Sequence, residues 1–240
     1  MRGAWRSLRE YRMVATESAQ QLEARREAAP AVAIALGLLL ILALVSWLEG
    51  WRLLETMGWW IWLALAIPAL LLTLDLVLGA RGDTRGQSRR AALALLRLLV
   101  LANMLGLMVL IAGLVSTSTR DLGGGELLLS AAVLWATNVI VFGVWFWEVD
   151  AGGPGARALH GRTPSDFQFP QDENPALAAP GWRPEVWDYL YVSLTNSIAF
   201  SPTDAMPLSL SAKRLMGLES VLSIVTVLLV AARAVNVLAS

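Results

Sequence analysis

The chain has 240 residues, of which 56% are hydrophobic and 16% are charged, and its 19 basic and 19 acidic side chains balance. This composition is typical of an integral membrane protein and excludes an ordinary soluble domain. The chain contains no cysteine and one histidine, which excludes disulfides, thiolate chemistry and metal sites built from cysteines or several histidines.

Residues 1–29 are polar and rich in arginine, and their apolar residues recur at helical spacing between Trp5 and Leu22. A secretory signal is not predicted, because no apolar stretch follows the first charges within a few residues. We expect a cytoplasmic amphipathic helix that lies on an anionic membrane surface. A solvated helix that packs on its neighbours is the alternative.

Residues 30–148 contain four apolar runs, each long enough to span a bilayer. Tryptophans mark several ends of these runs, and Pro68 predicts a bend in the second. A further run near the C-terminus is about 40 Å long at the standard helical rise. The sequence therefore predicts an all-α membrane protein with five transmembrane helices, over residues 31–47, 58–79, 91–116, 127–147 and 212–238.

Arginine is distributed unevenly among the loops. Residues 1–29 and 80–90 hold ten basic residues, whereas the loops across the membrane hold Arg52 and Arg120. The positive-inside rule therefore places the N-terminus in the cytoplasm. Four crossings return the chain to the same side, so the linker that follows also faces the cytoplasm.

This linker, residues 149–186, is rich in glycine and proline and has no apolar periodicity. We expect an irregular extramembrane loop. Phe167, Phe169 and Trp182 stand between turns and would let the loop fold over the segment that follows, whereas a disordered tether is the alternative. His160 is expected to be a solvated loop residue.

Residues 187–240 combine a short helix, a sharp polar turn and a long apolar helix. The short helix, residues 187–199, should stop at Ser201, because Pro202 disfavours helical geometry in the residue before it and lacks an amide donor. This pattern predicts a re-entrant segment. Its non-helical backbone is tolerated at membrane depth only where protein or water covers it.

Ser193 to Pro207 resembles the filter region of the two-helix potassium-channel pore module. Asp204 aligns with the aspartate of the TVGYGD signature, and residues 212–233 resemble the inner helix; the likeness covers about 50 residues. The filter departs from that pattern, because residues 199–203 read AFSPT and contain no glycine, so potassium selectivity is not implied. The AFSPTDAMP stretch is also similar to bacterial membrane proteins of unassigned function.

The resemblance implies an oligomeric, channel-like protein, tetrameric if the pore module is retained, with a monovalent cation as its ligand. In that family the filter opens outward, opposite to the orientation that the arginines predict. Asp204 would form an anionic ring that favours cations. The alternative is a non-conducting structural or partner-binding membrane protein. The filter-like residues are Thr195, Asn196, Phe200, Ser201, Pro202, Thr203 and Asp204.

Two ionisable residues lie inside the apolar runs. Asp75 precedes the end of the second run by about five residues, and Arg97 lies about seven residues into the third, so they reach similar depths. We expect a buried ion pair that latches the two helices. A proton or voltage role, or an Arg97 side chain that snorkels alone, are the alternatives.

The last helix carries a polar stripe that continues through Val230, at spacings of three and four residues. The stripe is expected to face protein, either along a water-filled path or in a self-association seam, with Asn103 and Asn138 available for interhelical hydrogen bonds. Its polar members are Glu219, Ser223, Thr226 and Arg233.

The sequence contains none of the motifs that mark common catalytic or phosphate-binding sites. We therefore expect neither an enzyme nor a cofactor, and no metal site. The basic residues lie next to membrane helices, where lipid headgroups are nearer partners than nucleic acids.

Overall fold

The computed structural model describes residues 24, 26–51, 58–78, 87–115, 124–162, 164–201 and 204–238. It gives the backbone alone at residues 78, 87–88, 114–115, 124, 177 and 232–238. The expected amphipathic helix falls almost entirely outside these residues.

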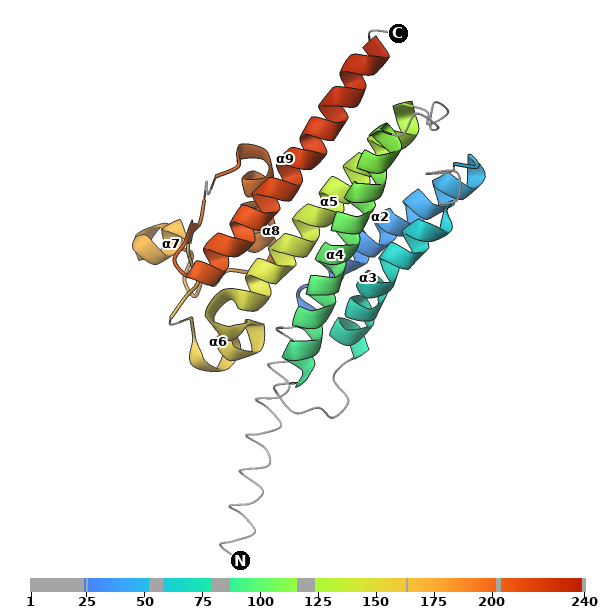
Figure 1. Cartoon of the computed structure of the whole chain (residues 1–240). Helices are drawn as coiled ribbons and strands as arrows, with labels where there is room; N and C mark the ends of the chain where they lie inside the picture. The colour runs from blue at the N-terminus through green and yellow to red at the C-terminus, as the bar shows by residue number, and fades with distance from the viewer. Residues whose placement is uncertain are drawn as a thin grey trace, which may run out of the picture.

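Five long helices dominate the described part of the chain (Figure 1). Each contains a segment long and apolar enough to cross a membrane, which confirms the predicted multi-pass helical architecture. Helix α3 continues through Pro68. The five helices are α2 (Ala29–Leu48), α3 (Trp60–Leu78), α4 (Gln87–Val115), α5 (Gly124–Val149) and α9 (Leu210–Leu238).

Helix α2 shows how local sequence sets a helix boundary. Pro30 lies in its first turn, where a missing amide costs nothing. Gly50 follows its end with a left-handed φ of 67°. The amide of Trp51 donates to the Ser46 carbonyl at 2.9 Å, so the turn satisfies one of the last helical carbonyls.

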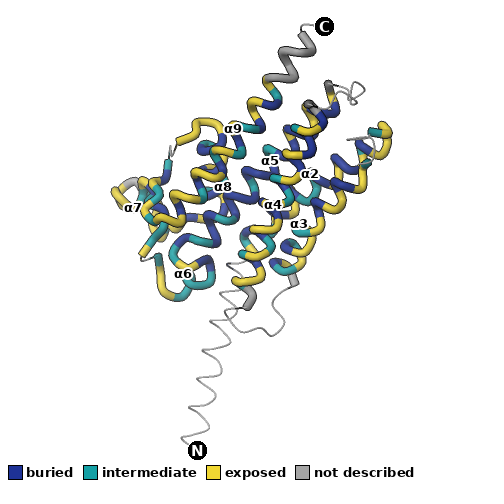
Figure 2. Tube along the Cα trace, in the orientation of Figure 1, coloured by how far each residue is buried: buried dark blue, intermediate teal, exposed yellow. Residues whose placement is uncertain are grey.

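Helix α5 is the centre of the molecule. It packs against α2, α4 and α9, while α3 packs against α2 and α4. Buried residues line the whole of α5, whereas the outer faces of α2 and α3 are exposed and apolar (Figure 2). Such a surface suits lipid.

The linker forms short helices and a strand over its described residues. The prediction of an irregular loop is therefore corrected, and the alternative of a disordered tether is wrong. Prolines stand in the first turns of α6, α7 and η3, where they favour helix starts rather than disorder. We call this unit the cap. It contains η2 (Asp150–Gly152), α6 (Pro154–His160), β1 (Phe167–Gln168), α7 (Pro170–Glu173) and η3 (Pro175–Leu177).

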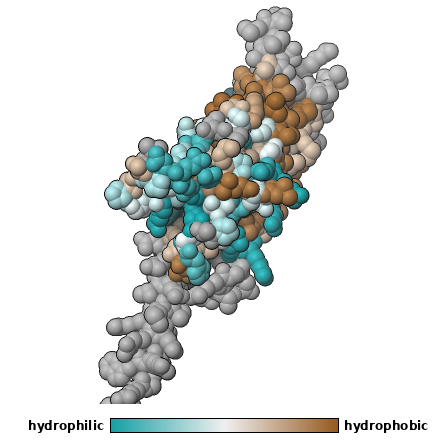
Figure 3. Space-filling view, turned by 90° about the vertical axis from the view of Figure 1, so that its left-hand side faces the viewer, coloured by the Kyte–Doolittle hydropathy of each residue, from teal (hydrophilic) through white to brown (hydrophobic). Residues whose placement is uncertain are grey.

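Several interactions define one end of the bundle, which we call the cap end. Arg26 donates to the carbonyl of Val77, and Arg89 donates to that of Glu148. The start of α2, the end of α3, the start of α4 and the end of α5 therefore meet beside the cap. Hydrophilic residues gather over the cap and hydrophobic residues lie beyond it (Figure 3).

Helix α8 (Val186–Ala199) nearly matches the predicted short helix and packs between α5 and α9. It begins at the cap end, where Glu185 and Asp188 form a capping box. After α8 the chain returns to the cap end, because β2 (Met206–Pro207) pairs antiparallel with β1. Helix α9 then starts beside the cap (Figure 1).

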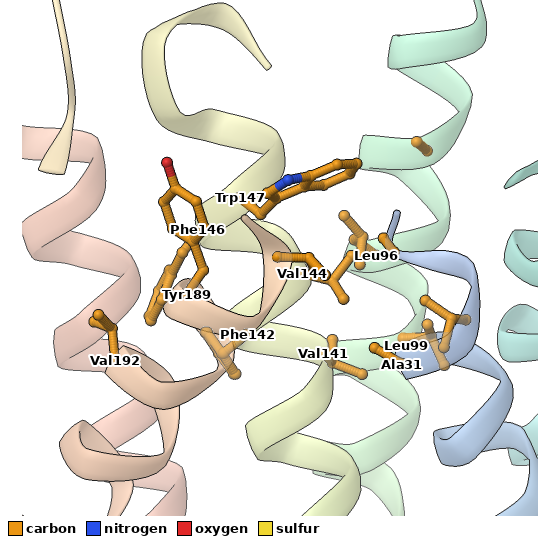
Figure 4. Packing of buried hydrophobic residues seen from close by; sticks show 14 of the residues in the cluster. Ala31, Leu96, Leu99, Val141, Phe142, Val144, Phe146, Trp147, Tyr189 and Val192 are labelled. Carbon is orange, nitrogen blue, oxygen red and sulfur yellow. The ribbon is translucent and has the colours of Figure 1, made fainter. Parts of the chain in front are cut away.

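A large apolar cluster lies among the helices and continues into the cap through Phe167 and Phe169. Tyr189 of α8 lies beside Phe142 and Phe146 of α5 (Figure 4). The Tyr189 ring also meets the rings of Phe167 and Phe169 edge to face, with centroids 6.0 and 5.3 Å away. This cluster fixes the position of α8 against the central helix.

Candidate functional site

A buried polar cluster joins α5, α8 and α9 at Glu219. Glu219 is fully buried on α9, and its Oε2 accepts a hydrogen bond from Asn196 Nδ2 at 2.7 Å. Its Oε1 contacts the hydroxyl of Ser193. The same hydroxyl lies 2.7 Å from the carbonyl oxygen of Val139 on α5. We call Glu219, Ser193, Asn196 and this carbonyl the Glu219 cluster.

Asn196, one of the predicted filter-like residues, is turned toward α9 and is 2% exposed. Its Nδ2 donates to the carbonyl of Met216 at 3.0 Å as well as to Glu219, and its Oδ1 accepts from the Ser220 hydroxyl at 3.3 Å. The amide is therefore fully engaged inside one chain.

The other filter-like residues have different surroundings. The Thr195 hydroxyl donates within α8, to the carbonyl of Tyr191 or of Val192, each 3.0 Å away. Asp204 is half-buried. Phe200 and Ser201 are exposed, while Pro202 and Thr203 lie outside the described residues.

Phe200 ends α8 in a left-handed conformation, with φ 55° and ψ 27°. Its amide donates to the carbonyl of Asn196 at 3.0 Å. Glycine is the usual residue at such a cap, because a Cβ opposes positive φ. The turn thus contains left-handed backbone even though the sequence supplies no glycine.

The polar stripe of α9 faces α5 and α8 of the same chain. Ser223 is fully buried and accepts from Asn138 Nδ2 at 3.4 Å, and Thr226 donates to the carbonyl of Leu222. Side chains buried in this way cannot contact a second copy of the chain. The alternative of a self-association seam is therefore wrong for Glu219, Ser223 and Thr226. The Arg233 side chain lies outside the described part.

Asp75 and Arg97 are not joined. Asp75 is half-buried on α3, whereas Arg97 is exposed on α4. Among the ion pairs between described residues, none links these two side chains. The expected latch is therefore corrected: the two residues reach similar depths, but the rotation of α4 turns Arg97 outward.

A second polar centre, which the sequence did not predict, lies where α5 meets the cap. The carboxylate of Asp150 is fully buried. It accepts from Arg162 Nε at 2.6 Å, from the Tyr189 hydroxyl at 2.5 Å and from the amides of Asp166 and Phe167 at 2.7 and 3.1 Å. One carboxylate therefore connects α5, the cap and α8.

Arg157 encloses this centre from α6. It donates to the carbonyls of Trp147 and Asp150 at 2.6 and 2.7 Å, and its guanidinium lies over the rings of Trp147 and Tyr189. Arginines and aromatic residues interleaved in the linker were the only sequence signal for this arrangement, because their partners are distant along the chain.

Two groups of this centre, Tyr189 and Arg162, each keep a single protonation state at neutral pH. Burial raises the pKa of the Tyr189 phenol well above its usual range, although the charge of Arg157 opposes this shift. Burial lowers the pKa of Arg162, but hydrogen bonds to Asp172 and Asp150 outweigh it and leave a net increase. Tyr189 stays neutral and Arg162 stays charged, which indicates a structural joint.

A cavity of about 740 Å³ opens between the cap and the start of α2. Trp182, Arg183 and Glu27 contribute to its wall, and Arg183 pairs with Glu27 at 3.4 Å. His160 is exposed at the end of α6, as expected of a solvated residue. Over the described residues, no three His, Cys, Asp or Glu side chains come together as a metal site would require.

No protein-family model, curated protein or solved structure matches the chain.

Proposed function

We propose that the chain is an ion-channel-like protein of the bacterial inner membrane, in which α8 and the turn after it form a re-entrant segment. The main support is the path of the chain at the cap end. Helix α8 is about 21 Å long at the standard rise, too short to cross a bilayer core of about 30 Å. The chain then returns to the cap end, where β2 pairs with β1.

The depth of the turn supports an oligomer. Asn196 is level with Met216 and Ser220, and Ser220 lies roughly 15 Å along α9 from its first residue at the standard rise. Phe200 and Ser201 follow at similar depth and are exposed on the single chain. Irregular backbone cannot face lipid there, so water or a second copy must cover it.

Copies of the chain would associate around this turn, as a tetramer if the resemblance to the potassium-channel module holds. Asp204 would then form an anionic ring near the turn and favour monovalent cations. The absence of glycine disfavours the stacked carbonyl rings of a potassium filter, so little potassium-over-sodium selectivity is expected. The basic residues at the cap end support an orientation with that end in the cytoplasm.

A second function, a non-conducting membrane protein that retains channel-like packing, is favoured by one observation. Asn196 and Glu219 bind each other inside a single chain and leave few polar groups for a shared path. Stability alone would explain this pairing, because a buried amide and carboxyl require partners.

The test combines oligomeric mass in detergent with cation flux in liposomes. The channel proposal expects a tetrameric mass and sodium and potassium flux of similar size. Asp204→Asn should lower this flux several-fold, whereas Glu173→Gln, an exposed change on the cap, should leave it unchanged. A monomeric mass contradicts a shared path, and an oligomer without flux supports the non-conducting alternative.

A further inference from the structure

The Glu219 cluster contains one hydrogen fewer than its contacts require if the carboxyl is ionised. The Ser193 hydroxyl has a single hydrogen but lies within hydrogen-bond distance of two oxygens, the Val139 carbonyl and Glu219 Oε1. The carbonyl can only accept. If Ser193 donates to Val139, its contact with an ionised Glu219 sets two lone pairs against each other.

The hydrogens of Asn196 cannot resolve this shortage. Its Nδ2 group has two hydrogens, and these already go to Met216 O and Glu219 Oε2. The Ser220 hydroxyl donates to Asn196 or to Met216 rather than to the carboxyl. One further hydrogen, located on Glu219 Oε1, satisfies every contact in the cluster.

Among the described residues, no neighbouring charge offers an alternative explanation. The ionisable residues of the packed helices α8, α5 and α4 do not pair with the carboxyl of Glu219, which is fully buried, and neither do the nearest described ones on α9 itself. A buried carboxylate without a counter-ion is strongly disfavoured. The ionisable residues concerned are Asp188, Tyr189, Tyr191, Glu126, Glu148, Arg89, Arg90, Arg97, Lys213 and Arg214.

We propose that Glu219 is a proton-binding site, which holds its carboxyl as a neutral acid that donates to Ser193 while Ser193 donates to Val139. This inference does not depend on ion conduction, since it concerns the packing of a single chain. It gives the proton a structural role. Loss of the proton would leave two acceptors competing for one hydroxyl hydrogen, and Ser193 would lose its hydrogen bond to α5 or to α9.

Glu219→Gln tests the proposal, because its amide can donate to Ser193 and accept from Asn196 as the neutral acid does. The folded wild type would hold one more proton than the unfolded chain above the ordinary carboxyl range. Its unfolding equilibrium constant should therefore rise up to tenfold per pH unit there, until the folded state also releases the proton. The melting temperature of Glu219→Gln should fall less with rising pH than that of the wild type, whereas Glu173→Gln should retain the full fall.

Infrared spectroscopy of the full chain in deuterated buffer at neutral pH gives a second measurement. The wild type and Glu173→Gln should show the carbonyl stretch of a protonated carboxylic acid, and Glu219→Gln should lose the part due to Glu219. If Glu219→Gln does not fold, Glu126→Gln provides the test, because Glu126 is another buried carboxyl that could produce the same stretch. A stretch that persists in Glu126→Gln supports the proposal.

Three outcomes would overturn the proposal. The first is a wild type that shows no such stretch. The second is a Glu219→Gln variant that folds but has an unchanged spectrum. The third is a melting temperature that rises with sodium or potassium concentration in the wild type but not in Glu219→Gln. Such a result would mean that a metal cation, and not a proton, neutralises the carboxylate.

Discussion

Phe200 is the residue on which the reversal after α8 depends. A non-glycine residue at positive φ is uncommon and carries a conformational cost. Its side chain is 43% exposed and so recovers little of that cost by burial within one chain. The conformation persists because the Phe200 amide caps α8, while Ala205 is buried nearby along the returning chain.

Replacing Phe200 by glycine should therefore stabilise the turn more than replacing it by alanine does. Both changes remove the ring, but only glycine adopts φ 55° without a Cβ penalty, so a difference of about 1 kcal/mol is expected. Thermal unfolding of the two variants in the same detergent measures it. Equal stabilities would show that the Phe200 backbone is not strained.

Tyr189→Phe isolates one hydrogen bond of the Asp150 centre. Removing the hydroxyl leaves the buried carboxylate with one donor fewer, which should cost about 1.5–3 kcal/mol. Tyr191→Phe is the matched control, since Tyr191 is 52% exposed on the opposite face of α8 and should change stability little. Similar losses in both variants would argue against a special role for Tyr189.

Alkaline pH should act on the same residue. The folded-state pKa of Tyr189 is raised above that of an unfolded tyrosine, about 10, so its contribution to stability is complete below that pH. The contribution is lost progressively at higher pH, because the unfolded chain ionises first. Absorbance of tyrosinate during an alkaline titration should show Tyr189 ionising only as the chain unfolds, and Tyr189→Phe should lack this step.

At the scale of elements, α5 and α8 approach each other at Gly143. A Cβ added to Gly143 would lie 2.8 Å from the Cα atom of Leu190, so the α8 backbone would have to move. Ser193 and Tyr189 flank this contact on α8; Ser193 bonds to α5, and Tyr189 bonds to Asp150, which directly follows α5. The small residue therefore sets the distance at which both polar centres form.

Gly143→Ala should destabilise the protein by about 1–3 kcal/mol, as overpacking usually does. Gly37→Ala on α2 is the control, because nothing lies within 4 Å of its added Cβ and alanine favours helix. Melting temperatures of the two variants provide the measurement. A Gly143→Ala protein as stable as Gly37→Ala would mean that α8 shifts without cost.

The elements also explain how much could be predicted from the sequence. The spanning helices and α8 were predictable, because apolar run length and Pro202 are local signals. The cap was not, because its order comes from contacts such as Asp150 with Tyr189, 39 residues apart. The direction of Asn196 was also missed, since the rotation of α8 is set by its pairing with Glu219 and not by its own apolar pattern.

At the scale of the molecule, the two ends of the bundle differ in charge and structure. The cap, with Arg157, Arg162 and Arg183, lies at the end where α4 brings Arg89. This arrangement adds basic residues to the end that the positive-inside rule already assigns to the cytoplasm. The linker and the N-terminal arginines thus support the same orientation.

Single cysteines test this orientation, because the chain has none of its own. His160→Cys, exposed on the cap, should react with a membrane-impermeant maleimide only after cells are permeabilised. Glu49→Cys, exposed at the opposite end of α2, should react in intact cells. The reverse pattern would place the cap outside the cytoplasm and restore the orientation of potassium channels.

The pairing of β1 with β2 has a consequence for how the protein is made. The ladder closes a loop that contains α8, and the amide of Leu208 adds a bond to the Asp166 carbonyl at 2.8 Å. Ser193 of α8 bonds to α5, which leaves the ribosome earlier, and to Glu219, which leaves it later. In the proposed orientation α8, which is too short to insert as a spanning helix, would stay on the cytoplasmic side until α9 is made. Chains released before α9 is complete would expose Ser193 and Asn196 without their partners, and quality control could recognise them by that defect.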